Sequence, residues 1–584
     1  MKGPPIIKII PRFFLIVLFS LAPCLALAEK PAPTTSGLAY EAMEFKAGEI
    51  IVKFRDGVSQ DRIQSLLLRE DMRVLDELDG PSTGLRPALS GAEVAGLGFM
   101  LLSVPKGQEL EKIEELKRNP AVEYAEPNYR FRVLDTAVVE PHHGLRAPDV
   151  IPNDPYYPSQ WNLPKIKAPA AWDITTGSHR VVIAVVDSGV DLDHPELEDK
   201  IWTNPGEIAG NKVDDDKNGY VDDVHGWDFV NLKGEPQDDY GHGTFVAGIA
   251  AAETNNANLI AGVSWGAQIM PVKVVDSQGF SYLWNMASGI RYASKNGAKI
   301  IHLSPSLYSF VDPQPLQDPI NDAHNKGVLI VAGSGDPNPK DPEPPAPDAY
   351  QYPASLDHVV SVAATNQGDG HPEFSTHNDR VDIAAPGVEI RSFWEGGYGW
   401  ISSTRVAAAH VSGLAALVWS VNPTLTPDEV ESIMEATAVD VGEPGRDDDF
   451  GHGRIDASAA VRATTHHLEI EPDEGFYFLV CDDCDPSPRK ITNPNTNCST
   501  WSATATASWL SIGPCEGYTP SSVAVSIDRD KLPGYGLHTA VITVTSTMTS
   551  SVNNPKTIPA TVRYTSQCWR NYLPLLLTGR LGNW

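Results

Sequence analysis

The chain has 584 residues, of which 45 are Lys or Arg and 75 are Asp or Glu, so its formal net charge is −30. Hydrophobic residues make up 41% and charged residues 21%, a globular composition that excludes a wholly disordered chain. The length indicates about three or four folded units. So acidic a chain repels phosphate backbones, and we expect it not to bind nucleic acids.

The first 28 residues have the pattern of a secretory signal peptide. Basic residues precede the apolar run 13–27, which ends in the small-x-small pattern of a signal-peptidase site. We therefore expect export to the extracellular space with cleavage after Ala28; an uncleaved anchor and lipidation at Cys24 are the alternatives. No later stretch approaches ~18 uninterrupted apolar residues, so stable membrane insertion of the mature chain is not expected.

Residues 29–150 predict a small α+β unit followed by a connector. Alternating apolar residues, which predict strands, are followed in turn by amphipathic stretches, which predict helices. The expected elements are strands at 49–54, 99–104 and 122–129 and helices at 61–68 and 107–118. From residue 135 to 155 the periodicity is lost and Pro and His accumulate, which is typical of an exposed connector.

Residues 151–465 alternate between apolar runs typical of buried strands and helical stretches. The expected strands are 181–186, 269–275, 299–303, 328–332 and 359–363, and the expected helices are 243–252, 282–296 and 315–326. This alternation predicts an α/β unit, a parallel sheet covered by helices on both faces. Catalytic residues of such a unit lie at the carboxyl ends of the strands.

The composition changes at about residue 466, and Thr, Ser and Val dominate residues 466–584. Expected strands at 501–511, 522–527 and 539–546 predict a small antiparallel β-sandwich. All five cysteines after the apolar N-terminus lie here, at 481, 484, 498, 515 and 568. Disulfides fit an exported chain, with zinc at the first two cysteines as the alternative, and the odd number leaves at least one thiol outside any intrachain pair.

Two polar residues stand where a parallel sheet presents catalytic groups. Asp187 directly follows the apolar run 181–186, and His242 lies 55 residues later, between two glycines at the start of a predicted helix. A carboxylate at a strand end is well placed to orient a histidine. Each residue alone is commonly a turn or capping residue, but the two together indicate a catalytic pair.

Residues 156–465 resemble the subtilisin-like serine peptidases. The resemblance rests on Asp187-Ser188-Gly189, Gly241-His242-Gly243-Thr244, Tyr352-Pro353-Ala354, Ala384-Ala385-Pro386-Gly387 and Gly451-His452-Gly453. It implies a subtilisin-like fold, polypeptide substrates, Asp187 as the orienting acid and His242 as the general base. Residues 45–129 resemble the family's inhibitory propeptide, which implies that the chain's own propeptide is a partner.

The chain departs from the family at the nucleophile. The family pattern Gly-Thr-Ser-Met-Ala-x-Pro-His-Val corresponds to residues 403–411, which read Ser-Thr-Arg-Val-Ala-Ala-Ala-His-Val. His410 and Val411 fix this register without gaps, so Arg405 stands where the nucleophilic Ser is expected. Arginine has five donors and no acceptor, and it stays protonated at neutral pH, so it cannot attack a carbonyl.

Two further departures concern the substrate. Asp336 stands where the family has the oxyanion-binding Asn, and an ionised carboxylate repels an oxyanion, although a few active relatives carry Asp there. Ser304-Pro305-Ser306 replaces the usual Ser-Leu-Gly of the edge that pairs with the substrate backbone, and Pro305 removes one donor. Because Arg405 and Asp336 would both be buried and have opposite charges, we expect their guanidinium and carboxylate to lie within about 4 Å; Asp187 is the rival partner.

An acidic loop predicts a structural Ca²⁺ site. Asp214, Asp216 and Asn218 occupy positions 1, 3 and 5 of a calcium loop, Tyr220 offers its carbonyl at position 7, and Asp222 falls at position 9. Position 12 lacks the Glu of a helix–loop–helix site. The alternative is a solvated acidic turn.

Taken together, these features predict a secreted homologue of the S8 serine endopeptidases that is catalytically inactive and binds peptides or surfaces. The alternative is an active secreted serine endopeptidase with a rearranged Asp-His-Ser site that uses a hydroxyl at 402–404. The C-terminal region, around Trp501 and Trp509, resembles small immunoglobulin-like domains of the BACON type. A role in carbohydrate or surface binding and a role as a spacer both stay open.

Overall fold

The computed structural model describes much of the chain from residue 44 onward. The described ranges are 44–70, 72–77, 99–133, 138–139, 151–308, 313–337, 346–394, 397–465, 476–481, 489–493, 500–513, 516–518, 521–534, 536–546 and 556–565. The expected signal peptide and four of the five C-terminal cysteines lie outside the described residues.

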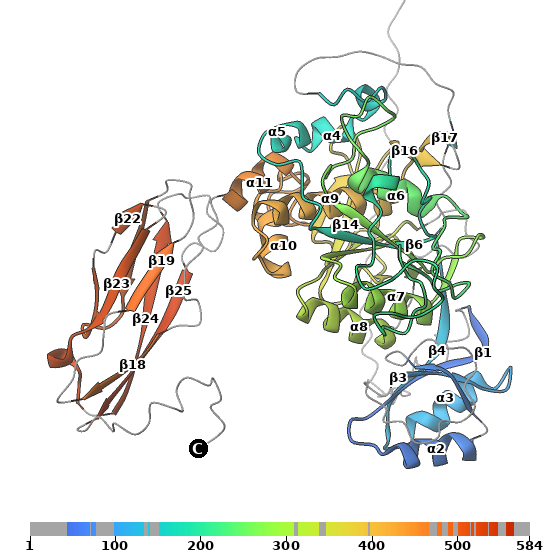
Figure 1. The fold of residues 1–584 in the computed structure, drawn as a ribbon, viewed down its shortest axis with the longest axis horizontal. Helices are drawn as coiled ribbons and strands as arrows, with labels where there is room; N and C mark the ends of the chain where they lie inside the picture. Colours follow the sequence, from blue (N-terminus) through green and yellow to red (C-terminus); the bar gives the residue numbers. More distant parts are fainter. Residues whose placement is uncertain are drawn as a thin grey trace, which may run out of the picture. The chain divides into compact units, whose positions relative to one another are not determined.

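A seven-stranded parallel sheet forms the centre of residues 151–465 (Figure 1). Its strands, in spatial order, are β15 (Ile383–Pro386), β14 (Val359–Thr365), β12 (Leu329–Gly333), β10 (Ile300–Leu303), β6 (Val182–Asp187), β8 (Gln268–Lys273) and β7 (Trp227–Asp228). Nearly all of these residues are buried, because helices cover both faces. The predicted parallel α/β architecture is therefore confirmed.

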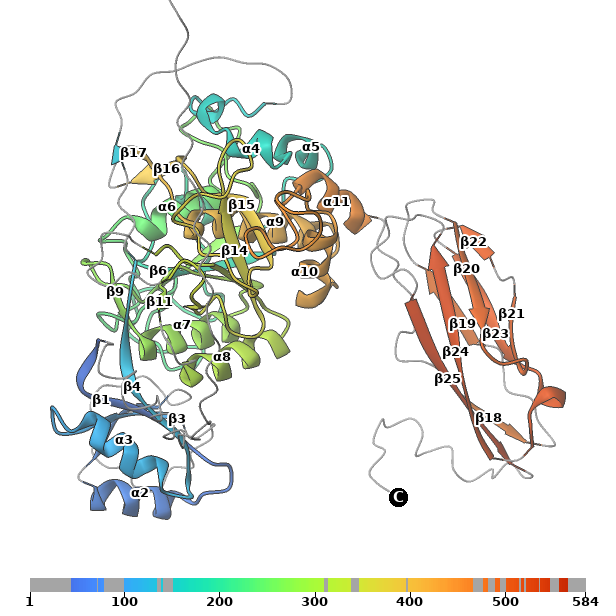
Figure 2. The same cartoon turned by 180° about the vertical axis from the view of Figure 1, so that it is seen from behind.

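The helices divide between the two faces of the sheet (Figures 1 and 2). On one face α6 (His242–Ala251) packs against α9 (Thr404–Val421), and on the other α7 (Leu283–Lys295) packs against α8 (Gln314–Asn325). The expected helices at 243–252, 282–296 and 315–326 correspond to α6, α7 and α8. Shorter helices complete the unit: α4 (Asn162–Lys165), α5 (Ala168–Trp172), α10 (Pro427–Ala436), α11 (Ala457–Thr465), and the 3₁₀ turns Tyr157–Ser159 and Glu198–Lys200.

Helix α9 forms the core of this unit. Within the described part of the chain it is the one helix whose length and composition would suit a membrane span, yet 89% of its 18 residues are buried inside the fold. Gly413 lets it approach α6, since a Cβ there would lie 2.9 Å from the Ala250 carbonyl oxygen. The first turn of α9 lies against the end of β12, since a Cβ on Gly333 would lie 2.6 Å from the Thr404 carbonyl carbon.

An α+β unit precedes the central one and shares a sheet with it. It contains β1 (Phe45–Phe54), α2 (Gln60–Arg69), β2 (Arg73–Glu77), β3 (Phe99–Ser103), α3 (Glu109–Lys117) and β4 (Val122–Arg132). The strand order is β2-β3-β1-β4, and the sheet continues where β4 pairs antiparallel with β9 (Phe280–Tyr282) of the central unit. The expected strands and helices of this region are present, and β2 is an additional strand.

Small sheets lie around the central unit. One pairs β11 (Leu307–Tyr308) with β13 (Gln351–Tyr352), and another joins the hairpin β16 (Ile390–Trp394) and β17 (Gly397–Ile401) to β5 (Val138–Val139). The second sheet shows that the connector segment pairs with a hairpin of the central unit.

The C-terminal region forms two sheets around its own core. One has the order β18-β25-β24-β20-β22, and the other has the order β19-β23-β21. The strands are β18 (Phe476–Cys481), β19 (Arg489–Asn493), β20 (Thr500–Ala505), β21 (Leu510–Gly513), β22 (Glu516–Tyr518), β23 (Ser521–Ile527), β24 (Gly536–Ser546) and β25 (Lys556–Thr565), with a 3₁₀ turn at Arg529–Lys531.

Two details of the expected antiparallel sandwich are corrected. Strand β18 pairs with β25 in parallel, so the larger sheet is mixed. The expected strand 501–511 is two strands, β20 and β21, which belong to different sheets. Apolar residues of both sheets, including Val525 and Ile542, form the common core.

Candidate active site

Asp187 and His242 form a buried hydrogen-bonded pair at one end of the sheet. Strand β6 ends at Asp187, and helix α6 begins at His242. The His242 Nδ1 lies 2.7 Å from Asp187 Oδ2, and both side chains are fully buried. The Ser188 amide donates to the other carboxylate oxygen at 2.6 Å. This arrangement can hold the imidazole in one orientation, as the orienting acid of a catalytic pair does.

Glycines allow the helix start to approach the acid. Gly241 adopts φ +99°, a conformation that favours glycine. A Cβ on Gly243 would lie 1.9 Å from the Gly189 carbonyl oxygen and 3.2 Å from the Cβ of Asp187. The glycines on each side of His242 are therefore needed for the short distance between histidine and acid.

The charge of Asp187 is maintained by its partners. Burial by itself raises the pKa of Asp187, but the His242 charge and hydrogen bond and the Ser188 N–H outweigh it, so the pKa is lowered. The carboxylate is thus ionised at neutral pH and can orient the Nδ1–H of His242.

His302 is a neighbouring ionisable group that sequence reasoning missed. It lies on β10, fully buried, with its Nδ1 3.2 Å from the Ser412 hydroxyl. Burial lowers its pKa to about 4, although Asp187 raises it in part. His302 is therefore neutral at physiological pH, and its only sequence signal was a polar residue inside an apolar run.

Arg405 lies in the first turn of α9 and makes the contact that its charge predicted. Its Nη1 donates to Asp336 Oδ2 at 2.6 Å, and only 5% and 12% of the two side chains are exposed. Its Nε donates to the Ser304 carbonyl oxygen at 2.9 Å, and its Nη2 donates to the Ser306 hydroxyl at 2.7 Å. The expected contact with Asp336 is confirmed, and the rival partner Asp187 pairs with His242 instead.

The three hydroxyls before Arg405 each hold a structural hydrogen bond. Ser402 Oγ accepts from the Glu389 amide at 2.9 Å. Ser403 is the N-cap of α9, where its Oγ donates to Asp336 at 2.7 Å and accepts from the Arg405 amide at 3.1 Å. Thr404 Oγ1 accepts from the Gly335 amide at 3.1 Å. These bonds serve the helix start and its neighbouring loops.

Residues 304–306 contact the N-terminal α+β unit as well as Arg405. Ser306 exchanges two backbone hydrogen bonds with Arg132, at 3.3 and 3.4 Å. On its other side the end of β4 pairs with β9, and the Val133 amide donates to the Gly279 carbonyl at 2.8 Å. Residues 130–133 therefore lie between two edges of the central unit, as a peptide in a groove would.

Side chains of the α+β unit fix this docking. Lys53 Nζ lies 2.8 Å from Asp318 of α8, and the Tyr124 hydroxyl donates to the same carboxylate at 3.0 Å. The Phe99 ring stacks on Trp284 of α7, with ring centroids 5.6 Å apart. Both helices that cover one face of the sheet thus take part.

The acidic loop brings together a carboxylate set that differs from the expected one. Asp214 and Asp216 lie with Glu207, with one oxygen of each within 4.8 Å of the others. Glu207 Oε2 is buried and has no hydrogen-bond partner among the described residues, so a cation would satisfy it. The set therefore fits Ca²⁺, which takes carboxylate oxygens. Glu207 was missed because it precedes the loop motif.

The other members of the expected calcium set make contacts of their own. The Asp222 carboxylate accepts from the Asn211 and Lys212 amides, at 3.1 and 2.8 Å, and closes a turn. Asn218 donates through its side-chain amide to Asp216 at 3.1 Å, and the ring of Tyr220, whose carbonyl is the expected ligand, packs on other aromatic rings. The loop spacing alone did not reveal these turn contacts.

The fold and this geometry define a class of parallel α/β proteins in which a buried Asp–His pair lies at the carboxyl end of the sheet. Comparison with known proteins identifies the family. Residues 178–453 match the subtilase family, peptidase S8, and residues 39–128 match the fervidolysin N-terminal prodomain. The chain is 33% identical over 426 residues to the thermophilic serine proteinase of Bacillus sp. (strain AK1), covering 73% of this chain and 90% of that protein.

Two more relatives agree. Thermitase of Thermoactinomyces vulgaris is 38% identical over 313 residues, which cover 53% of this chain and 99% of that protein. The extracellular basic protease of Dichelobacter nodosus is 31% identical over 457 residues, which cover 71% of this chain and 70% of that protein. The chain belongs to the subtilase family and carries a fervidolysin-like prodomain.

Proposed function

We propose that this protein is a secreted subtilase homologue that binds polypeptide without cutting it. The observation that carries this proposal is the Arg405 side chain, which stands at the nucleophile position of the family pattern. Its guanidinium is committed to Asp336 and to the edge at Ser304 and Ser306. Asp187 and His242 keep the geometry of an orienting acid and a general base, but residue 405 has no hydroxyl from which that base could take a proton.

Asp336 opposes catalysis in a second way. The tetrahedral intermediate of peptide hydrolysis needs donors aimed at its oxygen. The Asp336 carboxylate accepts from Arg405, from Ser403 and from the Thr404 amide, and therefore behaves as an ionised acceptor. It supplies negative charge where the reaction develops negative charge.

The active alternative requires a shifted nucleophile. One residue along a helix turns a side chain by about 100°, so a neighbouring hydroxyl faces away from the position of residue 405. The bonds of Ser402, Ser403 and Thr404 to Glu389, Asp336 and Gly335 also occupy those hydroxyls. The geometry favours the inactive form.

A casein-hydrolysis assay tests the proposal. The secreted chain is treated with a cysteine protease to open the prodomain, the added protease is inhibited, and hydrolysis is followed over hours. We expect the casein-hydrolysis rate to equal that of a control that contains the inhibited cysteine protease but not this chain. A rate that rises with the concentration of the chain, and that His242→Ala abolishes, would support the active alternative.

We also predict that the prodomain stays covalently attached. Residues 130–133 lie between β9 and Ser306, which contacts Arg405, and residues 138–139 pair with β17, which ends four residues before Arg405. The chain is therefore held near Arg405 at residues 130–133 and again at residues 138–139, and residue 405 offers no nucleophile to cut it. Intact-mass measurement of chain secreted from a protease-deficient host should show residues 29–150 still in place. A homogeneous N-terminus near residue 150 would refute this.

Calcium is proposed as a structural ion at Glu207, Asp214 and Asp216. Since binding to the folded state alone raises stability, millimolar Ca²⁺ should raise the Tm by several degrees over chelator. Asp216→Ala should remove this shift, whereas Glu235→Ala, an exposed acidic residue elsewhere, should retain it. Calorimetry with no difference between chelator and Ca²⁺ would favour a solvated acidic turn.

The remaining assignments concern the localisation, the domain boundaries, the C-terminal module and the partners. Relatives named as extracellular proteases support secretion. We assign residues 1–28 to a signal peptide, 29–150 to the prodomain and connector, 151–465 to the peptidase unit and 466–584 to the C-terminal module. We assign the C-terminal strands to a BACON-like, immunoglobulin-like module that attaches the protein to a surface or serves as a spacer. The polypeptide partners are the chain's own prodomain and external peptides, which could bind once residues 130–133 of the prodomain leave their position next to Ser306.

A further inference from the structure

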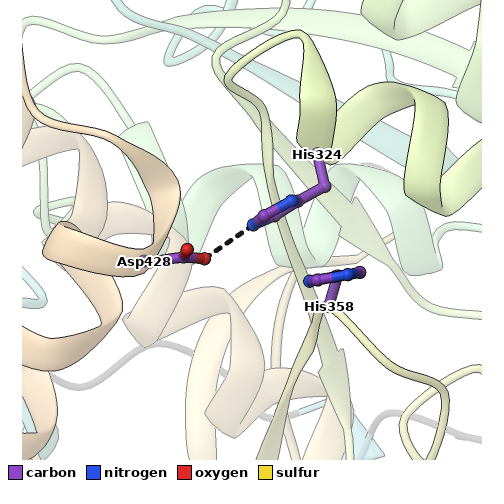
Figure 3. Close-up of side chains that lie close together, drawn as sticks. All are labelled: His324, His358 and Asp428. Carbon is purple, nitrogen blue, oxygen red and sulfur yellow. Dashed lines mark hydrogen bonds and ion pairs between the residues drawn. The ribbon is translucent and has the colours of Figure 1, made fainter.

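Three potential metal ligands from separate elements meet on the surface of the central unit (Figure 3). His324 lies in the last turn of α8, His358 directly precedes β14, and Asp428 lies in the first turn of α10. One ligand atom of each lies within 4.8 Å of the others, and His324 Nε2 is 2.7 Å from Asp428 Oδ1. None of the three belongs to the Asp187–His242 site or to the acidic loop.

We propose that these three side chains bind a divalent transition-metal ion, with Zn²⁺ as the best fit. Two imidazole nitrogens and one carboxylate oxygen are ligands that Zn²⁺ takes in tetrahedral sites, with water in the fourth position. A calcium ion prefers an all-oxygen set, so this site is chemically distinct from the loop at Asp214.

A simple ion pair does not account for the second histidine. The His324–Asp428 contact is complete without it, yet the His358 ring stacks on His324 with centroids 4.0 Å apart and planes 20° apart. His358 also has φ +64°, a backbone conformation that residues with side chains rarely adopt.

The exposure of the ligands suits a metal that keeps a water ligand. The His324 side chain is 16% exposed and Asp428 is 71% exposed, so one side of the site is open to solvent. A bound ion would link α8, α10 and the loop before β14, which the fold otherwise joins by packing. The expected role is a structural link between these elements.

Zinc titration of the full chain tests the proposal. Protein freed of metal by chelator is titrated with ZnCl₂ by calorimetry in excess Ca²⁺, which occupies the acidic loop. His358→Ala and Asp428→Ala, both at exposed positions, should each weaken the tightest Zn²⁺ binding by more than about 100-fold, because even outer-shell changes cost about 10- to 100-fold. Replacement by Co²⁺ should give visible absorption that these variants lose.

His377→Ala is the matched control. His377 also pairs with an aspartate, Asp449, at 2.8 Å, and its ring stacks with that of His371, but the centroids are 5.6 Å apart. The His377→Ala variant should bind Zn²⁺ as tightly as the unmodified chain. The C-terminal cysteines are present in all variants, so any Zn²⁺ that they bind does not distinguish one variant from another. The proposal is overturned if the unmodified chain binds no Zn²⁺, or if His358→Ala and Asp428→Ala, with circular dichroism unchanged, bind it as tightly as His377→Ala.

Discussion

The double variant Arg405→Ser, Asp336→Asn is expected to hydrolyse peptides, whereas Arg405→Ser alone stays far below it. Loss of the nucleophile costs on the order of a million-fold in turnover in subtilisin, a relative of this chain. Loss of the oxyanion Asn costs about 10²–10³ in turnover in the same enzyme. Since Asp336 would still oppose the oxyanion in the single variant, the double variant should be faster by at least about 100-fold.

Autoprocessing provides a second readout of the same pair of variants. The double variant should release the prodomain, because a serine at 405 would lie next to Ser306, the residue that pairs with Arg132 of the prodomain strand. Adding His242→Ala to it should abolish both hydrolysis and processing. Equal activity of the single and double variants would show that Asp336 does not oppose the reaction.

Asp336→Ala is expected to be the most destabilising single change at this site. It leaves a guanidinium that is only 5% exposed without its anion, and breaking a buried ion pair in this way costs about 3–5 kcal/mol of unfolding free energy. Arg405→Met should cost less, about 1–3 kcal/mol, because Asp336 keeps hydrogen bonds from Ser403 and the Thr404 amide. Asp336 also lies at the N-terminus of α9, where a negative charge is favoured.

Denaturant unfolding of the two single variants and the double variant measures this coupling. The variant that combines Asp336→Ala with Arg405→Met should lose less unfolding free energy than the sum of the two single losses, by about 0.5–3 kcal/mol. Losses that simply add would mean that the contact between Arg405 and Asp336 contributes nothing to the fold. Lys117→Ala, a surface change on α3 outside the site, provides the baseline.

The central sheet was predictable because its strands are buried on both faces. Runs such as 181–186 and 359–363 are then rich in Val and Ile with little polar alternation, which is typical of strands buried on both faces. The Asp187–His242 pair followed from the resemblance to the family. The Arg405–Asp336 contact followed from charge, since two buried opposite charges near one strand end stabilise each other best when paired.

Features that depend on long-range pairing were not predictable. The parallel pairing of β18 with β25 joins segments far apart in the chain, and nothing local in either strand specifies its partner. Glu207 precedes the loop motif and joins the carboxylates by accepting from the Asp215 and Asp216 amides. His324, His358 and Asp428 are isolated along the sequence and meet only through tertiary packing.

Active-site labelling with a fluorophosphonate tests the central claim most directly. The full secreted chain and the double variant Arg405→Ser, Asp336→Asn are labelled after a cysteine protease has opened the prodomain, and the labelled peptide is located by mass spectrometry. We predict no label on the natural chain and a label on residue 405 of the double variant. A label on Ser402, Ser403 or Thr404 of the natural chain, lost on adding His242→Ala, would contradict the account and establish a rearranged active site.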